Sequence, residues 1–252
     1  VLAGLAGTAG LVLAGCGGEK PAEPAAKSDG PEEGSLEWAV YGPWRSSSDR
    51  GRDAFRHPIE TLQFFGLSEG HTVIELWPGA GYWTDILAPY LKRNRGTYVP
   101  ALFEIGENAD PSAAQIVQRF EEKLKSAPDL YGSPKPSRFG ATSGDLADKG
   151  SADLVMFMRN LHNWMAAGIA EKAFADAFAA LKPGGILGIE QHRGDIGDNQ
   201  DPAAADGYVQ EPFVKQLAAE AGFALVASSE INANPNDTKD HPFGVWTLPP
   251  QR

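Results

Sequence analysis

Residues 72–84 read TVIELWPGAGYWT, and the rest of the chain can be interpreted outward from them. A short apolar run, 73–76, leads through a Trp-Pro step into a loop with two glycines, Gly79 and Gly81. Apolar residues then recur at helical spacing, so the pattern predicts a strand, a glycine turn and a helix. Such a turn lets the backbone approach a ligand, and free N–H groups at the helix start favour anionic or polar groups. A tight turn in any α/β protein would also suit the pattern.

Strand-like and helix-like stretches alternate along the chain from residue 36 to its end. The run 153–158 is almost unbroken in its apolar character, which a strand covered on both faces requires. In a parallel sheet the carboxyl ends of the strands line the ligand crevice, so polar residues that follow the strands are candidates for a site. The expected strands are 72–76, 97–103, 137–141, 152–158, 186–191, 223–231 and 244–248.

Several runs resemble a bacterial family of predicted class I S-adenosylmethionine-dependent methyltransferases. The loop has the spacing Glu-x-x-x-Gly-x-Gly of that class. The resemblance implies one α/β domain over residues 36–252: a Rossmann-like, doubly wound, mostly parallel seven-stranded sheet with an antiparallel last strand and helices on both faces. It also implies S-adenosyl-L-methionine as cofactor and a small-molecule acceptor, without naming the acceptor. The matching runs are 56–67, 75–91, 159–164, 181–193 and 236–242.

The resemblance also implies which residues contact the cofactor. An acid at the end of the second strand usually holds the ribose, but Leu102 occupies that place. Glu104 lies two residues on, on the same face of an extended strand, and is the candidate, although it could equally be a surface acid. Asp145 matches the acid that contacts the adenine, or it starts an Asx turn. The amino-acid end of the cofactor would lie on the loop, at Glu75, Pro78, Gly79, Ala80 and Gly81.

The fourth expected strand ends in the sequence RNLHNW, residues 159–164. Its position at the crevice makes Arg159 a candidate for cofactor binding and Asn160 and His162 candidates for catalysis. His162 could serve as a general base for a hydroxyl or amine, because the unperturbed pKa of histidine lies near neutrality. A histidine that only holds a loop in place would fit the same sequence pattern.

The N-terminal residues have the character of an export signal. Residues 1–15 are small and apolar, and the sequence LAGC ends at Cys16, the single cysteine. This resembles the signal and lipobox of a bacterial lipoprotein, which implies a lipid on Cys16, a membrane anchor and a location in the cell envelope facing the periplasm. An Ala-, Gly- and Leu-rich start with an incidental cysteine is the alternative. Residues 16–35 are predicted to be a disordered tether.

Charge and motif spacing restrict the function further. The net charge of −11 argues against a nucleic-acid partner, because phosphate binding favours a basic face. The histidines show no metal-binding spacing, so we predict no metal. Thr84 stands where the dinucleotide fingerprint requires its third glycine, which disfavours an NAD-dependent oxidoreductase. Two hypotheses remain: a methyltransferase, and an exported lipoprotein that uses this scaffold to bind a small molecule without methyl transfer.

Overall fold

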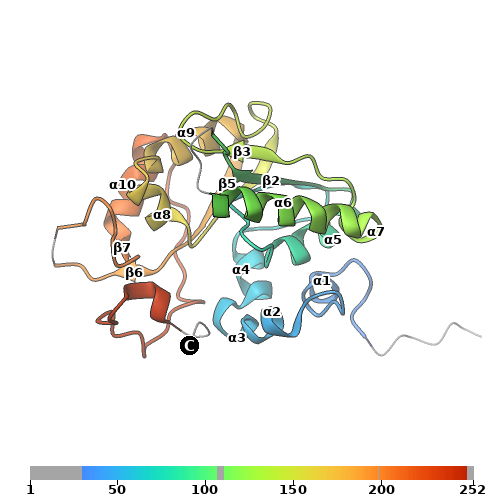
Figure 1. The fold of residues 1–252 in the computed structure, drawn as a ribbon, viewed down its shortest axis with the longest axis horizontal. Helices are drawn as coiled ribbons and strands as arrows, with labels where there is room; N and C mark the ends of the chain where they lie inside the picture. Colours follow the sequence, from blue (N-terminus) through green and yellow to red (C-terminus); the bar gives the residue numbers. More distant parts are fainter. Residues whose placement is uncertain (1–29, 107–110, 198, 249–252) are drawn as a thin grey trace, which may run out of the picture. The chain divides into compact units, whose positions relative to one another are not determined.

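The computed structural model describes residues 30–106, 111–197 and 199–248, and its centre is a parallel sheet. Five strands pair in the order β3-β2-β1-β4-β5, and every neighbouring pair is parallel (Figure 1). The strand order reverses beside β1, so the crevice at the carboxyl ends of β1 and β4 is where an open α/β sheet binds ligands. The strands are β1 (Thr72–Leu76), β2 (Thr97–Phe103), β3 (Ser137–Phe139), β4 (Ala152–Met158) and β5 (Leu181–Glu190).

Helices cover both faces of the sheet because successive strand residues point to opposite sides. On β1, Val73 packs into one core with α1, α4, α5 and α6, while Ile74 packs into a second core with α8, α9 and α10 (Figure 1). The helices are α1 (Leu36–Val40), α2 (Ser47–Gly51), α3 (Asp53–Arg56), α4 (Pro58–Phe64), α5 (Thr84–Arg93), α6 (Pro111–Ser126), α7 (Pro128–Tyr131), α8 (Leu161–Ala166), α9 (Ala170–Ala180) and α10 (Glu211–Glu220).

The seven-stranded sheet with an antiparallel last strand is not found among the described residues. Residues 223–231, predicted as a strand, have no regular structure, and residues 244–248 contain the short helix η1 (Gly244–Thr247) instead. Leu225 and Val226 are 65% and 83% exposed, so the segment lacks the burial that stabilises a strand. A separate two-stranded ladder pairs β6 (Arg193–Gly194) with β7 (Val209–Gln210).

The N-terminal predictions fall mainly outside the described part of the chain. Residues 1–15, Cys16 and the tether as far as residue 29 are not described. Pro31 begins the main compact unit, in which the Ser35 hydroxyl accepts a hydrogen bond from the backbone amide of Trp38 and caps α1. No helix within residues 30–248, as far as they are described, is both long and apolar enough to cross a membrane.

One buried carboxylate joins three helices near the glycine loop. Asp85, on α5, accepts hydrogen bonds from the Tyr131 hydroxyl on α7 at 2.8 Å and from the Lys123 ammonium on α6 at 2.7 Å. Its backbone carbonyl accepts a third from the Trp44 indole at 2.8 Å. Because Asp85 is only 3% exposed, these bonds fix α5, and with it the end of the loop, against α6 and α7.

We predict that Asp85→Ala lowers the free energy of unfolding by about 3 kcal/mol, since it strands a buried hydroxyl and an ammonium group. Urea denaturation at pH 7 measures this change. Asp148→Ala removes an exposed aspartate and should stay within ~0.5 kcal/mol of wild type. Equal effects of the two substitutions would contradict the role given to Asp85.

Candidate active site

The loop between β1 and α5 turns sharply because three of its residues adopt left-handed backbone conformations. The φ angles are +51° at Trp77, +59° at Gly79 and +92° at Gly81. Such angles are ordinary for glycine but costly for a tryptophan, so the surrounding structure must hold Trp77 in place. Its amide donates to the Ala101 carbonyl at 2.8 Å, and its indole N–H donates to the Phe139 carbonyl at 3.0 Å.

Asn160, predicted to be catalytic, lies against the same turn. Its side-chain amide donates to the carbonyl oxygens of Trp77 at 3.0 Å and Leu76 at 3.4 Å. Together with the bonds from Trp77, this contact ties the loop to β2, β3 and the residue that follows β4. In the present arrangement Asn160 therefore positions the loop.

Glu75, predicted as a cofactor residue, is a buried anchor of the strand that leads into the loop. Its carboxylate accepts a hydrogen bond from the Tyr98 hydroxyl at 2.5 Å, and the Thr84 hydroxyl lies 3.5 Å away. Burial raises the pKa of Glu75 to about 7, against the opposing effect of the Tyr98 hydrogen bond. The carboxylate thus joins β1, β2 and the start of α5, and it makes no free contact with solvent.

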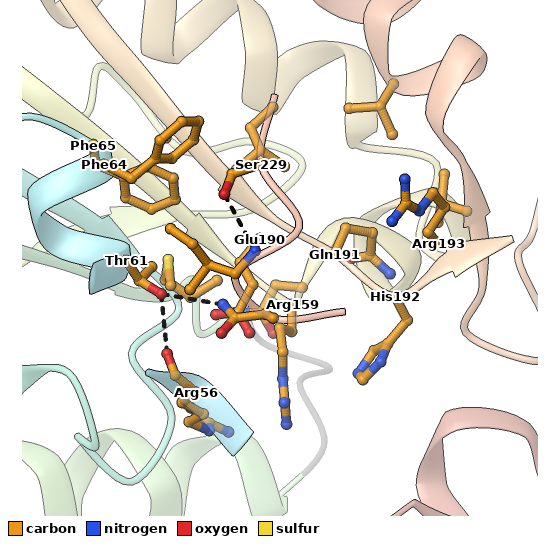
Figure 2. A pocket seen from close by; sticks show the side chains of 18 of the residues that line it. Arg56, Thr61, Phe64, Phe65, Arg159, Glu190, Gln191, His192, Arg193 and Ser229 are labelled. Carbon is orange, nitrogen blue, oxygen red and sulfur yellow. Dashed lines mark hydrogen bonds between the residues drawn. The ribbon is translucent and has the colours of Figure 1, made fainter. Parts of the chain in front are cut away.

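A cavity of about 1810 Å³ opens at the carboxyl ends of β1, β4 and β5 (Figure 2). The loop residues 77–80 and the segment 158–163 form part of its wall. Residues 52–57 and 223–237 close other sides. The volume exceeds the ~300–1,000 Å³ of a typical small-molecule site, so the cavity has room for more than one small ligand.

The two loop glycines have different surroundings. A Cβ added to Gly79 would meet no atom within 4 Å, and Gly79 lines the cavity together with Pro78 and Ala80. A Cβ on Gly81 would lie 3.1 Å from the Lys123 ammonium nitrogen, which also reaches the Ala80 carbonyl at 3.3 Å. Bare main chain therefore faces open space at Gly79, whereas Gly81 is covered.

The predicted ribose and adenine residues lie away from this cavity. Glu104, just after the end of β2, accepts hydrogen bonds from Thr142, whose amide and hydroxyl donate to its two carboxylate oxygens at 2.9 Å and 2.7 Å. Asp145 is exposed, and neither acid belongs to the cavity wall. Leu102, at the usual position of the ribose acid, is 2% exposed.

The half-buried indole of Trp77 packs among other aromatic side chains. Its ring centroid lies 4.5 Å from that of Phe103, 6.0 Å from Phe139 and 5.9 Å from Trp164. These aromatic side chains pack over the carboxyl ends of β2 and β3. The loop thus has a packed aromatic side and an open side that faces the cavity.

On the open side, Arg159 faces the cavity as predicted and is joined by two residues that sequence reasoning did not select, Arg56 and Glu190 (Figure 2). Arg159 has a φ of +57°, and its amide donates to the Glu190 carbonyl at 2.7 Å. Burial and the neighbouring Arg159 lower the pKa of Arg56 to about 10. Burial also raises the pKa of Glu190, whose Oε2 atom has no hydrogen-bond partner among the residues described. Glu190 could have been selected from the sequence because it lies at the end of an expected strand. Arg56 lies on a short helix, and no sequence pattern indicates a role for it.

His162 lies in the cavity wall beside a second histidine, His192. The Gln191 amide lies beside His162 Nδ1, with Nε2 at 3.1 Å and Oε1 at 3.4 Å, and its Nε2 also donates to the Gly207 carbonyl at 2.9 Å. The Gln191 side chain thus holds the His162 ring in place in the cavity wall. Burial lowers the pKa of His162, and burial with the charge of Arg159 lowers that of His192 to about 3. Among the described residues no group of three or more His, Cys, Asp or Glu side chains could hold a metal ion.

Comparison with solved structures relates this geometry to known folds. A SAM-dependent methyltransferase from Aquifex aeolicus is 19% identical, covers 68% of this chain and 82% of its own, and superposes with a TM-score of 0.51. The [4+2]-cyclase SpnF is 17% identical over 73% of this chain and 59% of its own, with a TM-score of 0.50. No protein-family model and no curated protein sequence matches the chain.

The chain has the fold of the class I S-adenosylmethionine-dependent methyltransferases. This agrees with the resemblance seen in its sequence. At identities below one fifth the likeness concerns the methyltransferase fold alone, and the reaction has to be argued from the site.

The buried Glu75 gives the domain a specific pH dependence. Because its folded pKa of about 7 lies above the unfolded value of about 4.3, its contribution to stability is complete below the unfolded pKa and is lost as pH rises through 7. Relative to Glu75→Gln, which keeps an acceptor for Tyr98, wild type should lose up to ~1.4 kcal/mol of unfolding free energy per pH unit in that window.

Urea denaturation of both proteins between pH 4.5 and 8 measures this difference. The exposed Glu60 supplies a control, since Glu60→Gln should track wild type at every pH. If the difference in unfolding free energy between wild type and Glu75→Gln stays constant from pH 4.5 to 8, Glu75 does not titrate in this window.

Proposed function

We propose that this protein is an S-adenosylmethionine-dependent methyltransferase that acts on a small molecule in the cavity beside β1, β4 and β5. The observation that carries the proposal is the bare main chain at Gly79, with no atom within 4 Å of an added Cβ, at the point where the strand order reverses. The methyltransferase fold supports it, and so does a cavity large enough for a cofactor and an acceptor.

The residues present fit the two ends of the cofactor unequally. The amino-acid end fits, because Gly79 offers an unobstructed backbone in the cavity wall. At the adenosine end the expected acids, Glu104 and Asp145, are outside the cavity wall, and Glu104 accepts hydrogen bonds from Thr142. We therefore propose that the adenosine end is held by the cavity wall without the ribose carboxylate of the family.

When bound, the cofactor would supply an activated methyl group on a sulfonium, and the protein would position that methyl group against the acceptor. Methyl transfer of this kind depends mainly on holding the two reactants in line. Asn160 fixes the loop through the Trp77 carbonyl, and His162 offers a neutral ring in the cavity wall. A base is needed only if the acceptor carries a proton, which remains the predicted role of His162.

Isothermal titration calorimetry with S-adenosylhomocysteine and S-adenosylmethionine tests this proposal. Gly79→Ala would place a methyl group into the ligand space and should weaken S-adenosylhomocysteine binding at least 10-fold. Gly150→Ala is a matched control: its φ is +64°, close to the +59° of Gly79, and an added Cβ also meets nothing within 4 Å. Gly150 is exposed and outside the cavity wall, so the backbone strain is similar and binding should be unchanged.

Two results would count against methyl transfer. One is no heat at millimolar concentrations of either adenosyl ligand. The other is an equal loss of affinity in Gly79→Ala and Gly150→Ala, which would mean that strain, rather than contact at the loop, determines binding.

A second function, small-molecule binding without methyl transfer, is favoured by the packed aromatic side of the loop. The Trp77, Phe103 and Phe139 rings occupy the carboxyl ends of β2 and β3, where the family's adenosine contacts were expected. SpnF, named as a cyclase, has the same general fold, so the fold does not fix the reaction. Mass spectrometry of the purified, unheated protein separates the two functions: a retained ligand without an adenosyl group supports the second.

The predicted lipid anchor bears on this choice. We propose that Cys16 carries a lipid that holds the protein in the cell envelope, facing the periplasm, where a supply of S-adenosylmethionine is doubtful. The mass of the N-terminal peptide from the membrane fraction tests the anchor. An unmodified Cys16 in a soluble fraction would rule it out and remove this argument against methyl transfer.

A further inference from the structure

We propose that Arg56 and Arg159 together bind an oxyanionic group, a carboxylate or phosphate, on the acceptor molecule. Both side chains belong to the wall of the same cavity, one from α3 and one from the residue after β4. Figure 2 shows their guanidinium ends extending toward the same region of the cavity, with His192 beside Arg159. Two guanidinium groups from separate elements offer the planar, forked donors that match such an oxyanion.

The two arginines lack the partners that buried cations normally have. Arg56 is 8% exposed, yet neither it nor Arg159 forms an ion pair or a side-chain hydrogen bond with any described residue. Glu190 attracts both guanidinium groups but forms no direct ion pair with either, and buried charges are usually paired directly. A ligand with negative charge would supply the missing partner.

Neighbouring arginines show what a partnered guanidinium looks like in this protein. Arg45 forms a bidentate pair with Asp53, at 2.7 and 2.8 Å. Arg52 pairs with Asp49 at 3.3 Å, and Arg193 binds Glu230 with both terminal nitrogens. Unlike these neighbouring arginines, Arg56 and Arg159 have guanidinium N–H groups that no described side chain accepts from.

The local charges leave a net positive field at the pair. Glu190 attracts both arginines and offsets one of the two charges. Glu75 is enclosed by Tyr98 and Thr84, and burial lowers the pKa of His162 and His192 so that both rings are neutral at pH 7. Arg52 adds positive charge at both arginines, so a net positive charge remains for a ligand.

The aromatic contact of Arg56 does not use its hydrogen-bonding capacity. Its guanidinium carbon lies 4.4 Å from the centroid of the Tyr82 ring, a stacking distance that stabilises the cation through its face. The N–H groups around the edge stay available. Tyr82 thus orients Arg56, and its own hydroxyl is held by Asp53 at 2.6 Å.

Backbone strain concentrates around the same cavity. Of the six non-glycine residues with positive φ among those described, four line it: His57, Trp77, Arg159 and Lys239. Arg56 immediately precedes His57, and Arg159 itself has a φ of +57°. Strained conformations of this kind persist at sites where the surrounding structure fixes them for a function.

The inference rests on the proposed function only in calling the ligand the acceptor, since oxyanion binding does not require methyl transfer. The cofactor also has a carboxylate, so the test must separate the two sources. Inorganic phosphate serves as the probe, and S-adenosylhomocysteine at saturating concentration serves as the competitor.

The experiment measures thermal unfolding of the full chain in increasing phosphate, against sodium chloride at equal ionic strength. We expect phosphate to raise the melting temperature beyond the chloride control, with and without S-adenosylhomocysteine. Arg56→Gln and Arg159→Gln should each weaken the apparent phosphate affinity at least 10-fold, yet Arg56→Gln should unfold in chloride no earlier than wild type, because it removes an unpaired buried charge. Arg138→Gln, on β3 and paired with Glu121, should respond to phosphate as wild type does.

Three results would overturn the proposal. The first is a phosphate effect on wild type no larger than that of chloride. The second is a response of Arg56→Gln and Arg159→Gln to phosphate equal to that of Arg138→Gln, which would make the pair structural. The third is loss of the phosphate effect in S-adenosylhomocysteine, which would assign the pair to the cofactor carboxylate. If S-adenosylhomocysteine does not bind while phosphate still acts through both arginines, the methyltransferase proposal fails and oxyanion binding stands.

Discussion

The left-handed turn at Trp77 is the constraint on which the site depends. A tryptophan in this conformation is strained, and bonds from three directions hold it: its amide to Ala101 on β2, its indole to Phe139 on β3, and its carbonyl to Asn160 after β4. Because the turn is fixed at three strand ends, the main chain at Gly79 emerges at a defined place. The cavity, the bare backbone and the position of Arg159 all follow from that geometry.

The turn also divides the carboxyl edge of the sheet into two environments. On the side of β2 and β3, the Trp77 indole packs with Phe103 and Phe139. On the side of β4 and β5, the wall includes the charged residues Arg159 and Glu190. The fold brings to one cavity a bare backbone that suits an amino-acid group and a pair of cations that suits an oxyanion. We propose that the cofactor uses the backbone and a small acidic acceptor uses the pair of cations.

Local pattern predicted the centre of the fold well and its edge poorly. The strands 72–76, 97–103 and 152–158 were predicted with the bounds they have, since buried apolar runs between turn signals are determined by nearby residues. The prediction of a strand at residues 223–231 was wrong because a strand needs a partner. Pairing with the edge strand β5 depends on tertiary contacts that the local sequence does not determine. Arg56 could not be found from sequence because its role depends on a distant residue, Arg159. Glu104 and Asp145 came from the resemblance, and the cavity lies on the other side of the loop from both.

A crystal structure of the protein grown with S-adenosylhomocysteine and inorganic phosphate tests the account most directly. The account predicts that the homocysteine portion lies against the main chain at Gly79, with a tetrahedral anion between Arg56 and Arg159. An empty Gly79 face, with the adenosyl ligand absent from the cavity or bound elsewhere on the chain, would contradict it.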